Sequence, residues 1–534
     1  MIRINEIKLA LDYSENDLKN AILKILRIDA ASLLSYKIVK KSVDARKKSN
    51  VFFTFCVNVQ IDGDEQAVIK RAKSKKVMEA PAVQTITIPH LHAGALRPVV
   101  IGFGPAGMFA ALLLARAGLK PIVLERGKRL DERKKDVQLF WTQHILNEES
   151  NVQFGEGGAG TFSDGKLNTG IKDPRRQYVL ETLAAFGAPE EVTYSNKPHI
   201  GTDKLEIVVT NIRKEIEKLG GEVLFNAKFT DLIIYNNTVQ GVSYESNGKK
   251  QDIETDAVIL AIGHSARDTI RSLHECGVKM MQKPFSVGAR IEHPQALINR
   301  AQYGDFADHP ALGAADYKLA CHGLHERGAY TFCMCPGGTV VAGASEKGGV
   351  VVNGMSEYAR DGRNANAALL VGIEPIDFDS EHPLAGMQMQ RTIEKTAFLL
   401  AGGDYKAPAQ LVGDFLEDKP SAAYGSVTPT CPTGTTLCEL KECLPPRVVQ
   451  TMKDAIVKMN EKLNGFSLPD AVLTAPETRS SSPVRILRDD TYQSNIDGLY
   501  PAGEGAGYAG GIVSSAVDGI RCTMALMEQN YRPL

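Results

Sequence analysis

The sequence lacks any run of about 18 consecutive apolar residues, the length that a membrane-spanning helix needs. It also lacks an excess of charge: 62 Lys and Arg face 63 Asp and Glu, for a formal net charge of −1. No overall field therefore favours nucleic acid or an anionic membrane. Nine cysteines scattered over 534 residues do not suit a disulfide framework, and no secretory signal pattern is visible. We therefore expect a cytoplasmic protein with no membrane contact.

What the sequence does have is a glycine-rich turn, IGFGPAG, at residues 101–107. It follows a short β-branched run typical of a buried parallel strand and precedes an Ala- and Leu-rich segment typical of a helix. Gly102 permits the tight turn, Gly104 lets a pyrophosphate approach the backbone, and Gly107 lets the helix pack on the strand. The amino end of such a helix attracts phosphate groups. The stretch thus predicts dinucleotide binding.

The residues that follow strengthen this prediction. A second apolar run, residues 121–124, ends at Glu125, near the spacing expected for a carboxylate on a ribose diol. A glycine-rich turn in an ordinary βαβ unit would leave both this acid and the third glycine unexplained. The acid also disfavours a 2′-phosphate, because two anions would repel each other.

Three separated segments line up with this motif: 101–107, DAVILAIGH at 256–264 and GLYPAGEGAGYAGGI at 498–512. Together they resemble the FAD-binding domain of glutathione-reductase-like flavoproteins. Further motifs at 154–170, 331–371, 405–415 and 476–489 resemble a bacterial family described as uncharacterised FAD-dependent, or NAD/FAD-utilising, dehydrogenases. The resemblance covers most of the chain. It implies non-covalent FAD and redox activity, without a defined substrate.

On this resemblance, Gly102 to Gly107 would hold the pyrophosphate, Glu125 the adenosine ribose, and Glu504 the ribityl hydroxyls. The helix after Gly511 would stabilise negative charge on reduced flavin. Phe229 is either an adenine contact or an ordinary strand core residue. The residues expected to contact FAD are Gly102, Gly104, Pro105, Ala106, Gly107, Glu125, Arg126, Gly157, Gly158, Thr161, Phe229, Ala261, Gly263, Gly503, Glu504, Gly511 and Ile512.

The resemblance and the patterning predict an α/β fold with four segments. Residues 1–90 form an α+β accessory domain, ferredoxin-like in its pattern of elements, followed by a Pro- and Gly-containing linker over 80–95. A discontinuous Rossmann-like FAD-binding domain with a parallel sheet begins at 95–285, with a possible insertion at 170–204. Irregular patterning marks 286–475 as an inserted α+β substrate domain. Residues 476–534 return to the FAD-binding domain and supply its last strand and helix.

The candidates for catalysis are Lys166, Cys333 and Cys335, and each has a simpler interpretation. Lys166 is interpreted either as a lysine near flavin N5 or a substrate carboxylate, or as an ordinary solvated lysine. Cys333 and Cys335 form a CxC pair that is a buried structural pair, a redox or substrate-pocket pair, or a metal site; a metal would need further ligands.

Four other polar residues leave two or more roles open. His264 is a flavin contact, an acid or a core residue. Glu477, Arg479 and Arg485 surround a triple-serine turn. The two guanidinium groups could bind a substrate carboxylate or phosphate, or form an ion pair between domains.

The function predicted is hydride transfer between flavin N5 and an unidentified small molecule. No second glycine-rich turn of this kind occurs, so NAD(P)H, if it is the electron donor, would dock transiently. One alternative is a flavin-dependent RNA-modifying enzyme that uses the basic segment 35–48, although lysines at a strand edge also discourage edge pairing. The other is a redox or interaction protein that binds FAD without turnover.

Overall fold

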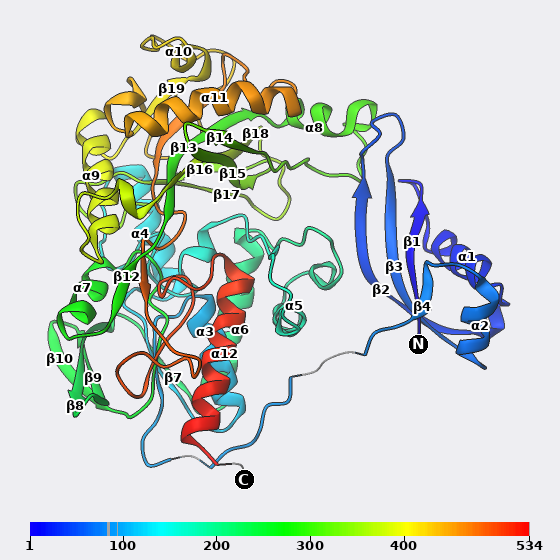
Figure 1. Ribbon diagram of the computed structural model, residues 1–534, viewed down its shortest axis with the longest axis horizontal. Coiled ribbons are helices and arrows are strands. Elements are labelled where there is room, and N and C mark those ends of the chain that lie inside the picture. The colour runs from blue at the N-terminus through cyan, green and yellow to red at the C-terminus, as the bar shows by residue number, and fades with distance from the viewer. Residues whose placement is uncertain (83–85, 93, 533–534) are drawn as a thin grey trace.

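The computed structural model describes residues 1–82, 86–92 and 94–532. Residues 83–85 and 93, which belong to the predicted linker, lie outside the described ranges, as do 533–534. Figure 1 shows a small N-terminal body standing to one side of a larger body, with helices α8 and α11 at one end and the C-terminal helix α12 toward the other. None of the helices in the described ranges is long and apolar enough to cross a membrane.

The N-terminal body is a four-stranded antiparallel sheet in the order β2-β3-β1-β4 with two helices. Ser14 caps the first helix in a capping box with Asp17. The order of its elements, βαββαβ, is the order of a ferredoxin-like unit. The elements are β1 (Ile2–Leu9), α1 (Glu15–Leu26), β2 (Leu33–Asp44), β3 (Phe52–Ile61), α2 (Glu65–Ala72) and β4 (Val77–Glu79).

This body contacts the rest of the chain through the free edge of β2. The Lys41 amide donates to the Tyr194 carbonyl at 2.9 Å, and the Asn196 amide donates to the Lys41 carbonyl at 2.8 Å. The Lys41 ammonium lies 4.4 Å from the centre of the Phe53 ring. Part of the basic segment 35–48 is therefore used for contacts within the chain.

The larger body contains a parallel sheet assembled from distant segments. Its order is β23-β11-β5-β6-β7, and every pairing is parallel. The prediction of a mixed α/β fold with a parallel sheet is confirmed. The strands and their covering helices are β5 (Val99–Ile101), α3 (Pro105–Arg116), β6 (Ile122–Leu124), α6 (Thr202–Lys218), β7 (Glu222–Leu224), β11 (Val258–Leu260), β23 (Leu499–Pro501) and α12 (Ile512–Asn530).

Both faces of this sheet are buried, which explains the uninterrupted apolar runs. Val100, Val123 and Ile259 pack in one cluster with α3, α6 and α12. Their neighbours Val99 and Val258 pack in a second cluster with an antiparallel meander, β10-β9-β8. The remaining elements around this sheet are α4 (Leu130–Gln143), α5 (Arg175–Ala185), β8 (Lys228–Tyr235), β9 (Thr238–Ser246), β10 (Lys249–Glu254), α7 (Arg267–Glu275), β12 (Met280–Gln282) and β22 (Val484–Ile486).

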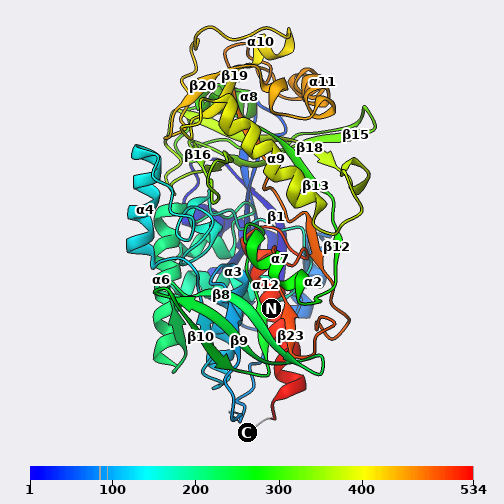
Figure 2. The same ribbon diagram turned by 90° about the vertical axis from the view of Figure 1, so that its left-hand side faces the viewer.

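Residues 285–477, called the cap segment here, lie between β11 and β23 in sequence and form a seven-stranded sheet in the order β14-β15-β18-β13-β21-β19-β20. The patterning of the sequence is irregular here because β13 and β18 are buried along nearly their whole length and show no alternation. Figure 2 shows α9 running across this sheet. The elements are β13 (Phe285–Pro294), α8 (Gln295–Tyr303), β14 (Ala320–Leu324), β15 (Arg327–Cys335), β16 (Thr339–Ala342), β17 (Val352–Met355), β18 (Asn364–Ile373), α9 (Ala385–Leu400), β19 (Ala407–Leu411), α10 (Val412–Leu416), β20 (Thr435–Leu437), α11 (Pro446–Lys462) and β21 (Val472–Glu477).

Candidate functional site

A cleft lies at the carboxyl ends of the parallel strands, between that sheet and the cap segment. Ligands bind at this edge in open α/β sheets. Two catalytic candidates, Lys166 and Cys333, line it. The predicted cofactor residues that line it are Gly102, Gly104, Pro105, Ala106, Glu125, Arg126, Gly158, Phe229, Ala261, Gly263, Glu504, Gly511 and Ile512.

Five of the residues proposed to contact FAD or to act in catalysis do not line the cleft: Gly107, Gly157, Thr161, Gly503 and Cys335. Thr161 and Cys335 are fully buried, and the Thr161 hydroxyl donates to the Glu156 carbonyl at 3.3 Å. These residues therefore support the wall instead of facing a ligand.

The glycine-rich turn serves both the fold and the cleft. Gly102 has a φ of +97°, and a Cβ on Gly107 would collide with the Gly102 carbonyl oxygen. Gly104 is different: its φ is −78°, and a Cβ there would meet only the Gly158 Cα, at 3.8 Å. Gly104 therefore leaves open space at the amino end of α3, where the first N–H groups of a helix have no intrahelical partners.

Glu125 ends β6 and is buried, with 5% of its surface exposed. One carboxylate oxygen, Oε1, accepts from the amides of Gly127 and Gly155, both at 2.9 Å. The other, Oε2, accepts from the Phe103 amide at 2.9 Å. A carboxylate offers about four acceptor positions, so Glu125 ties the turn to the next loop and keeps capacity for one hydroxyl donor.

Arg126 is held by acidic neighbours. Its guanidinium lies 2.6 Å from Glu149 and 2.8 Å from Asp268, and 4.2 Å from the centre of the Phe154 ring. Burial alone would raise the pKa of the Asp268 carboxyl. Hydrogen bonds from Arg126 and Lys228 have the larger effect, and they lower that pKa. Arg126 is therefore fixed as part of the cleft wall.

The glycine-rich loop 154–160 is organised by Arg133 of α4, a residue that the sequence analysis did not single out. Arg133 is fully buried and donates to four backbone carbonyls, those of Asn151, Val152, Glu156 and Gly158, at 2.7–3.0 Å. Burial lowers its pKa to about 10, so the side chain stays charged at neutral pH. No local signal could reveal this role, because the four acceptors are main-chain atoms that any sequence provides.

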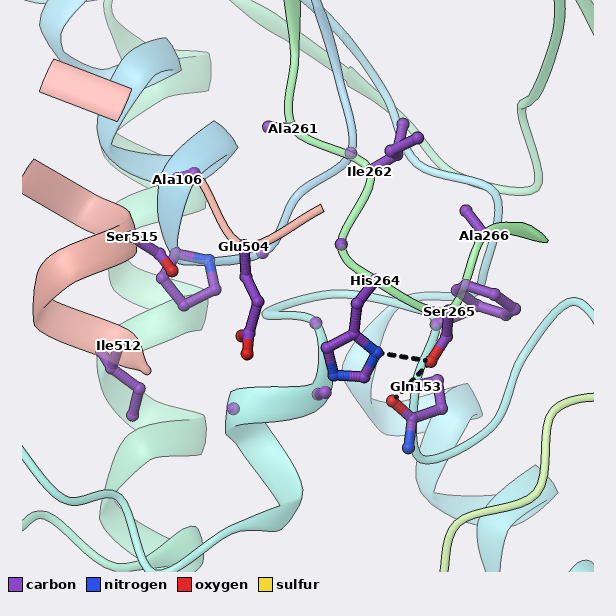
Figure 3. Close-up of a pocket in the computed structure, with 18 of the residues that line it drawn as sticks. Ala106, Gln153, Ala261, Ile262, His264, Ser265, Ala266, Glu504, Ile512 and Ser515 are labelled. Atoms are coloured by element: carbon purple, nitrogen blue, oxygen red, sulfur yellow. Dashed lines mark hydrogen bonds between the residues drawn. The ribbon is translucent and has the colours of Figure 1, made fainter. Parts of the chain in front are cut away.

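Glu504 follows β23 and points into the cleft beside His264 (Figure 3). Burial raises the pKa of Glu504 to about 7, against the opposing charge of Lys283. The turn that carries it is fixed from behind: the Gly503 amide donates to Asp518 of α12 at 2.8 Å, and Arg488 lies 2.6 Å from the same carboxylate. Asp518 and Arg488 were not predicted, since they become neighbours only in the folded chain.

His264 follows β11 and belongs to a short chain of polar side chains. Its Nδ1 lies 3.0 Å from the Ser265 hydroxyl, which lies 3.1 Å from Oε1 of Gln153. Figure 3 shows these contacts and the second ring nitrogen of His264 turned away from Ser265. Burial, with the positive charges of Arg479 and Arg267, lowers the pKa of His264 to about 3.

The cap side of the cleft presents Cys333 through an irregular strand. The register of β15 with β18 shifts between Phe332 and Cys335, and Cys333 has a φ of +42°. Successive side chains of a regular strand point to opposite faces, but a bulge can redirect one of them. Phe332 and Cys333 both line the cleft as a result, while Cys335 is buried.

The surroundings of Cys333 favour its thiolate. Fully buried Arg290 donates to the Cys333 carbonyl at 2.7 Å and pairs with Glu477. A hydrogen bond from Cys335, with the charges of Arg290 and Lys166, outweighs burial and holds the pKa of the Cys333 thiol well below its usual range. Lys166 itself lies 3.7 Å from Asp164.

Arg479 forms an ion pair, one of the two roles that the sequence left open. Arg479 lines the cleft but is paired with Glu394 at 2.7 Å, and Arg267 pairs with the same carboxylate at 2.8 Å. It is an ion-pair residue linking the cap segment to the parallel-sheet side. Arg485 instead lies 5.2 Å from the centre of the Tyr508 ring. Within the described ranges, no group of three or more His, Cys, Asp or Glu side chains could hold a metal ion.

Comparisons with known proteins find a relative of this chain and two family models that match parts of it. A protein of Clostridium beijerinckii, recorded as "Uncharacterized protein", is 50% identical over 532 residues, covering 99% of both chains. Residues 284–480 match the family model described as FAD-dependent protein, C-terminal domain-like. Residues 1–60 match a domain of unknown function, DUF8436.

The solved structures that the chain matches have much lower sequence identity. A glycerol-3-phosphate dehydrogenase of Bacillus halodurans complexed with FAD is 11% identical, over 82% of this chain and 66% of that chain, with a TM-score of 0.36. A flavoprotein/dehydrogenase of Cytophaga hutchinsonii is 14% identical, over 81% and 78%, with a TM-score of 0.34. A geranylgeranyl bacteriochlorophyll reductase-like protein of Thermoplasma acidophilum is 13% identical, over 81% and 78%, with a TM-score of 0.35.

Proposed function

The chain belongs to the same family as its Clostridium beijerinckii relative, and from that premise we propose that it is an FAD-dependent oxidoreductase acting on a small molecule. The observation that carries the proposal is the meeting of Gly104, Glu125 and Glu504 in one cleft, although they come from distant parts of the sequence. The match of residues 284–480 to an FAD-dependent family supports the same cofactor.

The residues present fit a dinucleotide. The open space at Gly104 leaves room for a pyrophosphate at the amino end of α3. Glu125 retains one acceptor position for a ribose hydroxyl, and Glu504 offers a carboxylate to the ribityl hydroxyls further along the cleft. Gly511, at the amino end of α12, has no atom within 4 Å of the position that a Cβ would take. That end would face the flavin ring and favour negative charge on it.

The cofactor, when bound, supplies the hydride chemistry at flavin N5. The chain's own contribution would be to orient the substrate against it. We place the substrate on the cap side, where Phe332 offers an apolar contact and Cys333 a thiolate near the charge of Lys166. A substrate with an apolar body and an anionic or electrophilic group suits this surface.

The domain boundaries, the electron donor and the location also belong to the proposal. We propose an FAD-binding domain formed by residues 95–285 and 476–534, with 286–475 as the substrate domain and 1–90 as an accessory domain. NAD(P)H is proposed as a transient electron donor. A cytoplasmic location stays a prediction from the sequence. An RNA substrate is the alternative proposal: Lys41 of the basic segment is paired with residues 194–196, whereas Lys37, Lys40, Arg46, Lys47 and Lys48 are exposed.

The test starts from the cofactor. The purified chain should carry a flavin absorption spectrum or acquire one when FAD is added, and the released flavin should be FAD. Anaerobic bleaching against a metabolite panel that includes NADH and NADPH should then identify the reductant. A correctly folded chain that stays colourless after reconstitution with FAD contradicts the proposal.

A further inference from the structure

The side-chain amide of Gln153 has a defined orientation. Its Nε2 donates to the Gly343 carbonyl of the cap segment at 3.2 Å. A carbonyl oxygen only accepts hydrogen bonds, so the NH₂ group of Gln153 must face it, and Oε1 must face Ser265. The opposite orientation would set two acceptors against each other. The cap segment thereby fixes which atom of Gln153 meets Ser265.

This orientation fixes the proton positions of the next two groups. A serine hydroxyl has one proton, and only by donating it to Oε1 of Gln153 can Ser265 satisfy the 3.1 Å contact. The 3.0 Å contact between Ser265 and Nδ1 of His264 then needs the histidine to donate. A neutral imidazole carries one proton, so Nε2 is left with a lone pair.

The surroundings of His264 keep the ring neutral. The positive charges of Arg479 and Arg267 act on the ring, against the opposing charge of Glu394, with which both arginines pair. They disfavour a second proton on the ring, as does its burial in the cleft wall. The ring nitrogen turned toward the Glu504 side of the cleft therefore accepts hydrogen bonds and does not donate them (Figure 3).

We propose that His264, held as the Nδ1–H tautomer by Ser265 and Gln153, is a second acceptor for the ribityl hydroxyls of the bound cofactor, beside Glu504. This assignment rests on the proposed function. An acceptor-only nitrogen suits a hydroxyl and not a phosphate oxygen, because neither partner in the second case supplies a proton. Strand β11, which leads to His264, pairs with β23, which leads to Glu504, whereas Glu125 follows β6 on the far side of β5. His264 thus belongs to the ribityl end of the cleft and not to the adenosine end.

The tautomer is measured directly on the FAD-loaded, full-length chain. The chain has 11 histidines, and ¹⁵N-histidine NMR distinguishes the two ring nitrogens of each. The His264 signals are assigned by their loss in His264→Gln and, independently, in His264→Asn. We expect a protonated Nδ1 and an unprotonated Nε2. Ser265→Ala should lose this preference, while Ser265→Thr, which keeps the hydroxyl, should retain it.

The ligand is tested by comparing FAD with ADP, which has the ribose and pyrophosphate but no ribityl chain. His264→Phe removes the acceptor and should weaken FAD binding about tenfold, the loss expected for one hydrogen bond. ADP binding, measured by calorimetry, should stay unchanged. His264→Gln places an amide oxygen within reach of the same position and should recover part of the FAD affinity.

The outcomes separate the two proposals. A protonated Nε2 in a chain that binds FAD normally overturns the assignment of His264 alone, and so does an equal loss of FAD and ADP affinity in His264→Phe. A wild-type chain that binds no FAD overturns the proposed function and the ribityl assignment with it. In that case the same NMR measurement on the cofactor-free, full-length chain still decides the tautomer.

Discussion

Gly104 and Gly107 lie in the same turn, but each lacks a side chain for a different reason. Gly107 packs against the Gly102 carbonyl, whereas Gly104 faces the open cleft. We expect Gly107→Ala to destabilise the fold by about 2 kcal/mol or more, because the backbone must shift. Gly104→Ala should cost no more than about 1 kcal/mol, the scale of an N-cap change, yet weaken FAD binding at least about tenfold.

Thermal unfolding of the cofactor-free chains and calorimetric FAD titrations check this pair, with each variant serving as the control for the other. If Gly104→Ala binds FAD as tightly as the wild type, the pyrophosphate does not approach this backbone. The contrast uses a distinction that the sequence cannot make, since both positions are simply glycine.

Glu504 should make the cofactor-free chain sensitive to pH in a defined direction. Its pKa is raised from an ordinary 4.5 to about 7 by burial. The folded chain therefore holds this proton more tightly than the unfolded chain, and the stability it contributes falls as pH rises from about 4.5 to about 7. Lys283 and Cys333 are the charged groups that act on it.

The measurement is the difference in melting temperature between wild type and Glu504→Gln at pH 5 and pH 8. Wild type should lose stability relative to the variant at the higher pH. FAD affinity should change the opposite way, improving through pH 7 as the carboxylate ionises and accepts hydroxyl donors. A melting difference that stays constant with pH would falsify the placement of this group.

At the scale of elements, α4 is joined to the glycine-rich loop by Arg133. Arg133→Met removes a donor from four carbonyl oxygens. Those of Glu156 and Gly158 keep Thr161 as a second donor, whereas those of Asn151 and Val152 lose the donor that Arg133 provides. Each unsatisfied group costs about 1–3 kcal/mol before relaxation, so we expect a net loss of about 3 kcal/mol or more. Hydrogen exchange should show lost protection over residues 151–158.

The neighbouring Lys134, whose exposed ammonium pairs with Glu206 at 2.9 Å, is the control. Lys134→Met should change stability by less than about 1 kcal/mol, and a similar effect of both variants would contradict the role of Arg133.

How far the sequence predicts each element depends on where its partners lie. The turn at 101–107, the capped helix α1 and the apolar strands β5 and β6 follow from local patterns, because capping and burial act within a few residues. The cap strands β13 and β18 do not, because buried polar residues such as Arg290, Glu292 and Asn366 interrupt the apolar run that marks a fully buried strand. Glu125 and Glu504 could be named in advance because each follows a recognisable motif. Asp518, Gln153 and Arg133 could not, because their partners come from other segments or from the main chain.

At the scale of the whole molecule, one carboxylate joins three separate segments. Glu394 lies on α9 of the cap segment, Arg267 begins α7 after β11, and Arg479 follows β21. The guanidinium groups lie 2.8 and 2.7 Å from Glu394, whose side chain is 2% exposed. The arrangement positions the cap segment over the parallel strands, and the same two cations act on His264. The relative placement of the two sheets and the electrostatics of the cleft thus depend on the same three side chains.

Glu394→Gln should therefore affect both stability and cofactor retention. Removing one partner of a buried ion pair costs about 3–5 kcal/mol, because the remaining charge stays buried. Here two arginines lose that partner, and Glu346, 2.6 Å from Arg267 and 3.8 Å from Arg479, stays as their carboxylate neighbour. We expect a loss of that size in urea unfolding and faster FAD release, since the cap segment is held less firmly over the cleft. Glu417→Gln, which breaks an exposed pair with Lys419, is the matched control and should cost less than about 1 kcal/mol. Equal losses in the two variants would show that the cap segment is held by its apolar contacts and not by this carboxylate.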